Sequence, residues 1–148
     1  MENKIKQQLA DYNKISKESD ILYHEYAIGH ALSDTTLWIF YSVIQGGKNY
    51  TQRELCSDWF FPPQTINTAL KALERKGLVK LLTCEGNKKN KYIVITEAGE
   101  KLAKEKVFPV IKAEENAIMK MSEEERDTFI SLTIKHEALL KEELEKLN

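Results

Sequence analysis

Apolar positions recur three and four residues apart over most of the chain, which predicts a mainly helical protein. A first helix is expected over about residues 3–29, with a stripe of Ile5, Leu9, Tyr12, Ser19, Leu22 and Tyr26. A second helix begins after Ser33 and ends at Gly46-Gly47, with Leu37, Phe40, Tyr41 and Ile44 facing inward. A third begins at the capping box TQRE, in which Thr51 and Glu54 exchange hydrogen bonds.

The stretch FPPQTINTALKALERKGLVK, residues 61–80, predicts a fourth helix with two distinct faces that ends at Gly77. At about 100° per residue, one face is apolar and suited to packing. It carries Ile66, Ala69, Leu70 and Leu73. The opposite face is polar and free to contact a partner, and it carries Gln64, Thr68, Lys71 and Arg75.

A β-hairpin and further helices follow this stretch. Residues 78–82 and 92–95 are predicted strands, joined by the basic segment CEGNKKNK, which places a basic hairpin after a helix-turn-helix. Thr96 can cap a helix over about residues 97–121 that tolerates Pro109 or kinks there. Ser122 opens a second capping box before a final helix. One face of that helix carries Phe129, Leu132, His136, Leu140, Leu144 and Leu147.

Charge is distributed unevenly along the chain. Residues 62–91 carry 7 basic and 2 acidic side chains, a net charge of +5, whereas residues 1–61 have a net charge of −2 and residues 92–148 of −4. A solvated helix face could produce such an island by chance. A surface that faces phosphate explains the clustering better.

Composition and motif searches narrow the class of protein. The 148 residues with 42% hydrophobic content suit one domain with its own core. We expect neither a signal peptide nor a membrane span, and two distant cysteines do not suggest a disulfide framework, so a cytoplasmic location is expected. The sequence has no nucleotide-binding or metal-ligand motif, and His24, His30 and His136 lack a ligand spacing. No enzyme activity, cofactor or metal is expected.

An ordered set of segments resembles the MarR family of winged helix-turn-helix transcription regulators. The segments are LSDTTLWIFYSVI, TQRELC, PQTINTALKALERKGLVK, the basic hairpin and ITEAGEKL. The resemblance covers about residues 32–103 motif by motif, and the flanking helices match in position only. Its most specific parts are Thr65–Val79 and the turn Ile95–Gly99.

The resemblance implies a single MarR-like domain over residues 1–148, mainly α with a small β-hairpin wing. Residues 31–99 would form the winged-helix DNA-binding unit, and residues 1–30 and 100–148 would supply N- and C-terminal dimerisation helices. The implied function is that of a homodimeric, ligand-responsive transcription regulator, more often a repressor, that binds a pseudo-palindromic operator in double-stranded DNA. A thiol-oxidation sensor on the same fold and a winged helix used for protein contacts remain alternatives.

Two departures from the family pattern bear on DNA recognition. Many members have Asp-x-Arg at the wing tip, where this chain has Asn87 and Lys89, so the internal ion pair is absent. Thr68 occupies the position of a common arginine, which shifts base readout toward uncharged side chains. The residues predicted to contact DNA are Thr51, Gln52, Pro63, Gln64, Thr65, Asn67, Thr68, Lys71, Arg75, Asn87, Lys88, Lys89 and Lys91.

Pro62 and Pro63 stand where a helix-capping side chain is usual. Pro63 suits the first helical position because it lacks the N–H that would be unpaired there, and it holds Pro62 extended. The N–H groups of Gln64 and Thr65 would then be available to a DNA phosphate. A stiff turn without any functional role is an equally good interpretation.

An effector site and a redox role are two further hypotheses. Family members bind small aromatic acids between the dimer lobe and the DNA-binding lobe. The residues expected to border such a cleft are Tyr26, His30, Trp38, Tyr41 and Phe108, although aromatic residues at helical spacing are more often core. Cys56 is expected to pack inertly in the third helix, and Cys84 at the hairpin edge is the better candidate for regulatory oxidation.

Overall fold

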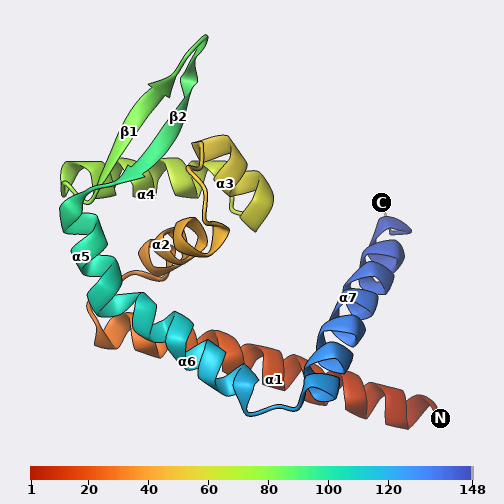
Figure 1. Cartoon of the computed structure of the whole chain (residues 1–148). Helices are drawn as coiled ribbons and strands as arrows, with labels where there is room; N and C mark the ends of the chain where they lie inside the picture. Colours follow the sequence, from red (N-terminus) through yellow and green to blue (C-terminus); the bar gives the residue numbers. More distant parts are fainter. Residues whose placement is uncertain (148) are drawn as a thin grey trace. The chain divides into compact units, whose positions relative to one another are not determined.

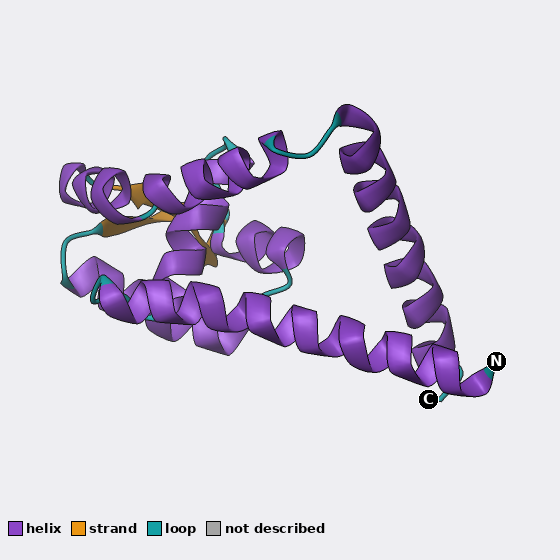
Figure 2. Ribbon diagram, turned by 90° about the horizontal axis from the view of Figure 1, so that it is seen from below, coloured by secondary structure: helices purple, strands orange, loops and turns teal. Residues whose placement is uncertain are grey.

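The computed structural model describes residues 1–147 and contains seven helices and one hairpin within that part of the chain (Figures 1 and 2). The order is α1 (Glu2–Gly29), α2 (Asp34–Gly46), α3 (Gln52–Trp59), α4 (Pro63–Arg75), β1 (Val79–Cys84), β2 (Asn87–Ile95), α5 (Glu97–Lys106), α6 (Phe108–Met119) and α7 (Glu123–Glu145). The predicted fold class, mainly α with a small hairpin wing, is confirmed.

The chain divides into two compact units, Met1–Phe108 and Pro109–Asn148. The first contains α1 to α5 and the hairpin, and the second contains nearly all of α6 and all of α7. The predicted dimerisation segment 100–148 crosses this boundary, and its last residue lies outside the described residues. The single-domain organisation stays a prediction.

Four helices begin at hydroxyl side chains, as the sequence predicts. Each hydroxyl accepts a hydrogen bond from a first-turn N–H that has no partner within its own helix. Two of the starts are complete capping boxes, because Glu54 and Glu125 also accept from the N-cap backbone. The four pairs are Ser33 with Thr36, Thr51 with Glu54, Thr96 with Gly99, and Ser122 with Glu125.

The core of the first unit lies between α2, α3, α4 and the inner face of the hairpin. The predicted apolar face of α4 is confirmed at three of its four positions, since Ile66 and Leu70 are fully buried and Leu73 is 3% exposed, whereas Ala69 is half-buried. In α2, Leu37 and Phe40 are buried as expected, but Tyr41 and Ile44 are only half-buried. Other buried members of this core are Ile39, Ser42, Leu55, Val79 and Ile93. Helix α2 is therefore covered on more than one side, by α1, α3 and α4.

The hairpin differs from its prediction in the length and register of its second strand. Strand β2 begins at Asn87, five residues earlier than expected. The strands pair regularly from Val79 with Ile95 up to Thr83 with Lys91, and the next pair is Cys84 with Asn87. Residues 88–90 therefore form a bulge on β2. Near the base of the wing, the Ile93 N–H donates to the Tyr50 carbonyl over 2.9 Å, so the segment before α3 extends the sheet.

The sequence predicts one helix over residues 97–121, and the structure corrects this, because it has two helices there. Helix α5 ends at Lys106, and α6 begins at Phe108. Pro109 lacks the N–H that would continue the ladder, which favours a break just before it. The Tyr26 hydroxyl donates to the Lys106 carbonyl over 2.8 Å, and the Lys106 ammonium donates to the His30 carbonyl over 2.7 Å. These reciprocal bonds fix the end of α1 to the end of α5.

Candidate nucleic-acid interface

The outer face of α4 is the centre of the predicted DNA-binding surface. Its side chains Gln64, Thr68, Lys71 and Arg75 are exposed, opposite the buried Ile66 and Leu70. Asn67 lies at the edge of this face and is half-buried, and its amide oxygen accepts from Gln52 Nε2 over 3.4 Å. Helix α4 thus presents amide, hydroxyl and cationic groups on a helix whose other side is fixed by packing.

The start of α4 has the geometry that the two prolines predict. Pro62 is extended, with φ −63° and ψ 122°, and Pro63 is the first helical residue. Within the described chain, no side chain caps this helix. The first-turn N–H groups of Gln64 and the exposed Thr65 therefore lie at the surface, at the positive end of the helix dipole.

Thr51 and Gln52 begin the neighbouring helix α3 and have different settings. Thr51 is 7% exposed, and its hydroxyl and backbone N–H are both engaged with Glu54. Bonds from the Thr51 backbone N–H and then from its hydroxyl lower the pKa of the Glu54 carboxyl. Gln52 is half-buried, with its amide directed to Asn67. Thr51 therefore shapes the start of α3, while Gln52 lies closer to the polar face of α4.

The wing presents Lys88 and Lys89 on an ordered bulge, and Lys91 follows it in the paired part of β2. The Asn87 side-chain oxygen accepts from the Lys89 N–H over 3.1 Å and from the Asn90 N–H over 3.3 Å. Lys88 and Lys89 are exposed, and Lys91 is half-buried. Asn87 thus orders the wing through backbone hydrogen bonds, in a chain that lacks an Asp-Arg pair at this position.

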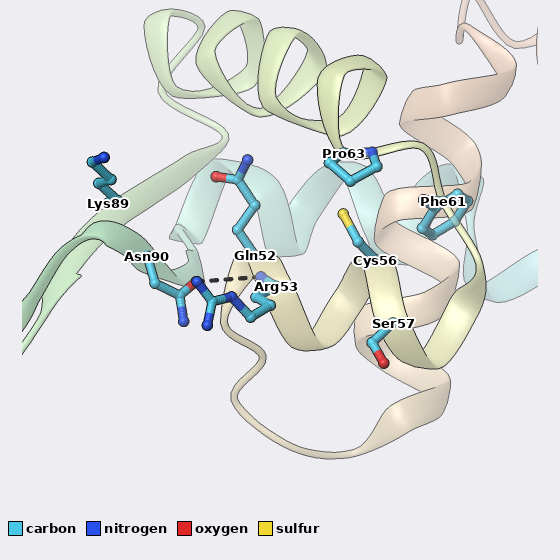
Figure 3. Close-up of a pocket in the computed structure, with 8 residues that line it drawn as sticks. All are labelled: Gln52, Arg53, Cys56, Ser57, Phe61, Pro63, Lys89 and Asn90. Atoms are coloured by element: carbon cyan, nitrogen blue, oxygen red, sulfur yellow. Dashed lines mark hydrogen bonds between the residues drawn. The ribbon is translucent and has the colours of Figure 1, made fainter.

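A hollow of about 430 Å³ lies between α3, the turn into α4 and the wing (Figure 3). In Figure 3, Lys89 and Asn90 come from the wing and Gln52 and Arg53 from the first turn of α3, and Lys89 lies apart from the other three. Cys56, Ser57, Phe61 and Pro63 complete its lining. Cys56 is half-buried rather than packed in the core, and burial raises the pKa of its thiol.

Arg53 and Asn90 were missed by the sequence analysis. The capping box TQRE already places Arg53 in the first turn of α3, next to the predicted contact Gln52, so a signal for it existed. Asn90 could not be found in this way, because its position depends on the bulge in β2. Both residues are adjacent to residues that were predicted to contact DNA.

Comparison of the sequence with protein-family models and with curated proteins finds no match. Solved structures do share the fold. The MarR family regulator NMB1585 from Neisseria meningitidis superposes with a TM-score of 0.81 over 95% of this chain and 99% of its own, at 14% sequence identity. The chain has the MarR fold.

Two further structures with the MarR fold are similar over most of their length. MepR from S. aureus, in complex with DNA, has a TM-score of 0.67 at 23% identity and covers 87% of this chain and 94% of its own. The transcription regulator MarR from Oenococcus oeni has a TM-score of 0.66 at 20% identity, over 93% and 98%. Helices α3 and α4 therefore form the helix-turn-helix of the MarR fold, and β1 and β2 form its wing.

The five predicted effector residues divide among three settings in this MarR fold. Tyr26 stacks on His30 with ring centroids 4.0 Å apart, and burial raises the pKa of its hydroxyl. Trp38 meets the edge of Tyr41 at 5.2 Å. Phe108 is 46% exposed and borders a separate hollow of about 330 Å³. That hollow is also lined by Ile44, Ile95, Glu100, Ala103 and Lys104.

The Trp38 group belongs to a longer aromatic series within the MarR fold. Tyr23 of α1 contacts Trp38 at 4.8 Å, and Tyr41 contacts Trp59 of α3 at 6.1 Å. The series joins three helices, which is the packing role that aromatic residues at helical spacing usually have.

Among residues 1–147, no helix has the length and apolar character that crossing a membrane requires, and no cluster of three or more His, Cys, Asp or Glu side chains is placed to hold a metal.

Proposed function

We propose that this protein is a sequence-specific transcription regulator that binds double-stranded DNA as a homodimer. The observation that carries the proposal is the two-sided α4, with a buried apolar face and an exposed polar and basic one, beside a lysine-bearing wing. The net charge of +5 over residues 62–91 provides attraction to phosphate. The solved DNA complex of MepR, which shares the fold, supports the same assignment.

In this proposal the two DNA-facing elements have different roles. Helix α4 lies in the major groove, where Gln64 and Asn67 can each make a pair of hydrogen bonds with an adenine edge. The wing lies along the flanking minor groove, where Lys88, Lys89 and Lys91 interact with phosphates irrespective of sequence. The uncapped start of α4 donates its free N–H groups to a further phosphate. Recognition therefore rests on α4, and much of the non-specific affinity rests on the wing.

The dimer is proposed from apolar surface that the chain leaves uncovered. Ile5, Leu9 and Leu22 of α1 are each more than half exposed, and α7 contains no buried residue in the described chain. Exposed apolar surface of this extent on two helices is typical of an interface. A two-fold dimer would also place two α4 helices on a pseudo-palindromic operator.

The repressor and effector roles complete the proposal. A small aromatic acid that fits only a spread form of the dimer would shift the population away from the DNA-binding form. Such an acid is expected to quench tryptophan emission and weaken DNA binding together. Quenching that persists unchanged in Trp38→Phe would remove Trp38 from the effector site, and the absence of any coupled change would contradict the ligand response.

The thiol-sensor alternative has weaker support at one of its two cysteines. A reactive cysteine needs a stabilised thiolate, whereas burial raises the pKa of Cys56. Cys84 is half-buried at the wing tip. It is therefore the remaining candidate for the oxidised cysteine of a thiol sensor. Loss of a regulatory response in Cys84→Ser, with the response retained in Cys56→Ser, would favour this alternative over a ligand.

The test of DNA binding begins with genomic fragments that the protein retains, which define an operator. Affinity for the operator and for a scrambled duplex is then measured across a salt series. We expect the operator to bind at least about 1,000-fold more tightly. Lys88→Ala should weaken both duplexes alike and reduce the salt slope by about one unit, and Lys101→Ala on α5 is the charge-matched control. Salt-insensitive binding would favour the protein-interaction alternative.

A further inference from the structure

The first turn of α3 receives one of its hydrogen-bond partners from the wing. The N–H groups that begin a helix have no partner within it. Thr51 accepts from Glu54 through its hydroxyl and from Leu55 through its carbonyl. The Arg53 N–H donates instead to the side-chain oxygen of Asn90, over 3.3 Å (Figure 3). A residue 37 positions further along the chain therefore caps this helix.

Asn90 is itself held in place by the bulge of the wing. Its backbone N–H donates to the Asn87 side-chain oxygen, and its own side-chain oxygen also accepts from the Lys91 N–H over 3.1 Å. The Ile93 N–H, three residues further on, donates to the Tyr50 carbonyl just before α3. Two hydrogen bonds thus join the wing to α3. One is the backbone bond from Ile93 to Tyr50, just before α3, and the other is the bond from the Arg53 N–H to Asn90.

The cap brings two cations to one hollow. Arg53 follows Gln52 in the first turn of α3, and Lys89 precedes Asn90 in the bulge, and all four residues line the hollow. None of the lining side chains is acidic. Among the ion pairs of residues 1–147, neither Arg53 nor Lys89 takes part, whereas Lys48, in the loop before α3, is paired with Asp58 at 3.1 Å. Within the described chain, the hollow therefore presents two cations that have no ion-paired carboxylate.

We propose that Asn90, with Asn87, is a positioning residue that joins the wing to α3 and holds Arg53 and Lys89 around one anion-binding hollow. The anion is a single backbone phosphate of duplex DNA, so this inference rests on the proposed function. The guanidinium supplies directed N–H donors, the ammonium supplies a mobile charge, and Gln52 lines the same hollow. The two cations are brought together by the cap rather than by an acidic partner.

The salt dependence of DNA binding tests whether the two cations share one phosphate. Each neutralised phosphate adds about 0.9 to the salt slope. Arg53→Ala and Lys89→Ala should therefore each leave the phosphate partly neutralised and change the slope by much less than one unit, whereas the double variant should reduce it by about one. Reductions of about one in each single variant and two in the double variant would show separate phosphates and overturn the shared site. Lys101→Ala with Lys104→Ala is the charge-matched double control.

Hydrogen exchange tests the cap without DNA. Asn90→Ala removes the acceptor, so the Arg53 amide should exchange at least about tenfold faster, while the Ile93 amide, bonded to Tyr50, stays protected and reports an intact fold. Asn90→Asp retains the acceptor oxygen and should restore protection of the Arg53 amide. Asn49→Ala, at an exposed loop position, is the matched control. Unchanged exchange of the Arg53 amide in Asn90→Ala would overturn the cap.

A double-mutant cycle joins the two parts of the proposal. Lys89→Ala should weaken binding to any duplex roughly fivefold in the wild-type background and less than about twofold in the Asn90→Ala background, because Lys89 is then no longer held at the hollow. Equal losses in the two backgrounds would separate Asn90 from Lys89 and overturn the positioning role. If the wild-type protein binds no duplex, the proposed function and the phosphate site both fail, and the exchange experiment still decides whether Asn90 caps α3.

Discussion

Helices α1 and α4 both carry apolar residues at helical spacing, but these residues have opposite surroundings. In α4, Ile66 and Leu70 are fully buried, whereas in α1, Ile5 is 59% exposed and Leu22 is 63% exposed. The apolar face of α4 meets the core of its own chain, whereas several apolar side chains of α1 stay more than half exposed in the described chain. Periodicity therefore predicts that a face will be buried, but it does not say whether the same chain buries it.

The largest expected effect comes from removing residues 123–148. Helix α7 contributes no buried residue in the described chain, so the core under α4 should survive the deletion. If α1 and α7 are covered by a second copy, the shortened chain should be monomeric or aggregated, and DNA affinity should fall by at least about 100-fold as two-site binding is lost. Light scattering with duplex binding measures both. A shortened chain that stays dimeric and bound to DNA would contradict the dimer.

The second largest effect is expected from a core substitution, which should distinguish the buried face of α4 from the exposed face of α1. Leu70→Ala should destabilise the folded chain by about 2 to 5 kcal/mol, because the side chain is fully buried. Leu22→Ala in α1 is the matched control. Leu22→Ala should weaken the association of the two copies, so that its loss of stability changes with protein concentration, since its neighbours would be supplied by a second copy. Denaturant unfolding at two protein concentrations makes the measurement, and equal losses independent of concentration would remove the distinction between the helices.

The polar face of α4 gives an intermediate effect. Asn67→Ala should cost roughly 1 to 3 kcal/mol on the operator and almost nothing on a scrambled duplex, because it removes a base contact rather than a charge. Thr36→Ala, in the first turn of α2, offers a comparison away from the predicted DNA surface. Binding titrations on the two duplexes at fixed salt measure the difference. An equal loss on both would assign Asn67 to the backbone instead of the bases.

The smallest effect concerns the capping box of α3. Hydrogen bonds from Thr51 lower the pKa of Glu54 below its ordinary value of 4.5, so the carboxylate stabilises the folded chain above that pH. This contribution is lost as the pH falls through the lowered pKa. Glu54→Gln should therefore reduce the melting temperature by about 1 to 2 °C at neutral pH, and the difference should close under acid conditions. Melting curves for wild type, Glu54→Gln and the hairpin control Glu85→Gln would show whether it does.

Local features of the structure could be predicted from the sequence. The caps at Ser33, Thr51, Thr96 and Ser122 depend on residues three positions apart, and the faces of α4 depend on its own periodicity, so each was predicted correctly. The break after Lys106 was predicted less well. Pro109 signals that the ladder fails nearby, but the exact end depends on Tyr26, which is 80 residues away in sequence.

The candidate site could be predicted only in part, because it too depends on contacts between residues that are distant in sequence. Lysines on a hairpin are visible in the sequence, and their clustering indicates a basic wing. The presence of Lys89 and Arg53 at one hollow depends on a three-residue bulge and on the bond from Arg53 to Asn90, which alternation of residue types does not reveal. The aromatic residues assigned to one cleft likewise divide among three settings, because sequence spacing does not specify which helices they join.

The bonds of Asn87 and Asn90 also bear on the kinetics of binding. They are made by neutral side chains within the free protein, so the wing is already ordered before it meets a partner. A preorganised loop loses little conformational entropy on association. The encounter rate should then follow electrostatic steering, and it should rise as salt is lowered without a slower ordering step after contact. The wing should therefore have the same conformation in the free protein and in the complex.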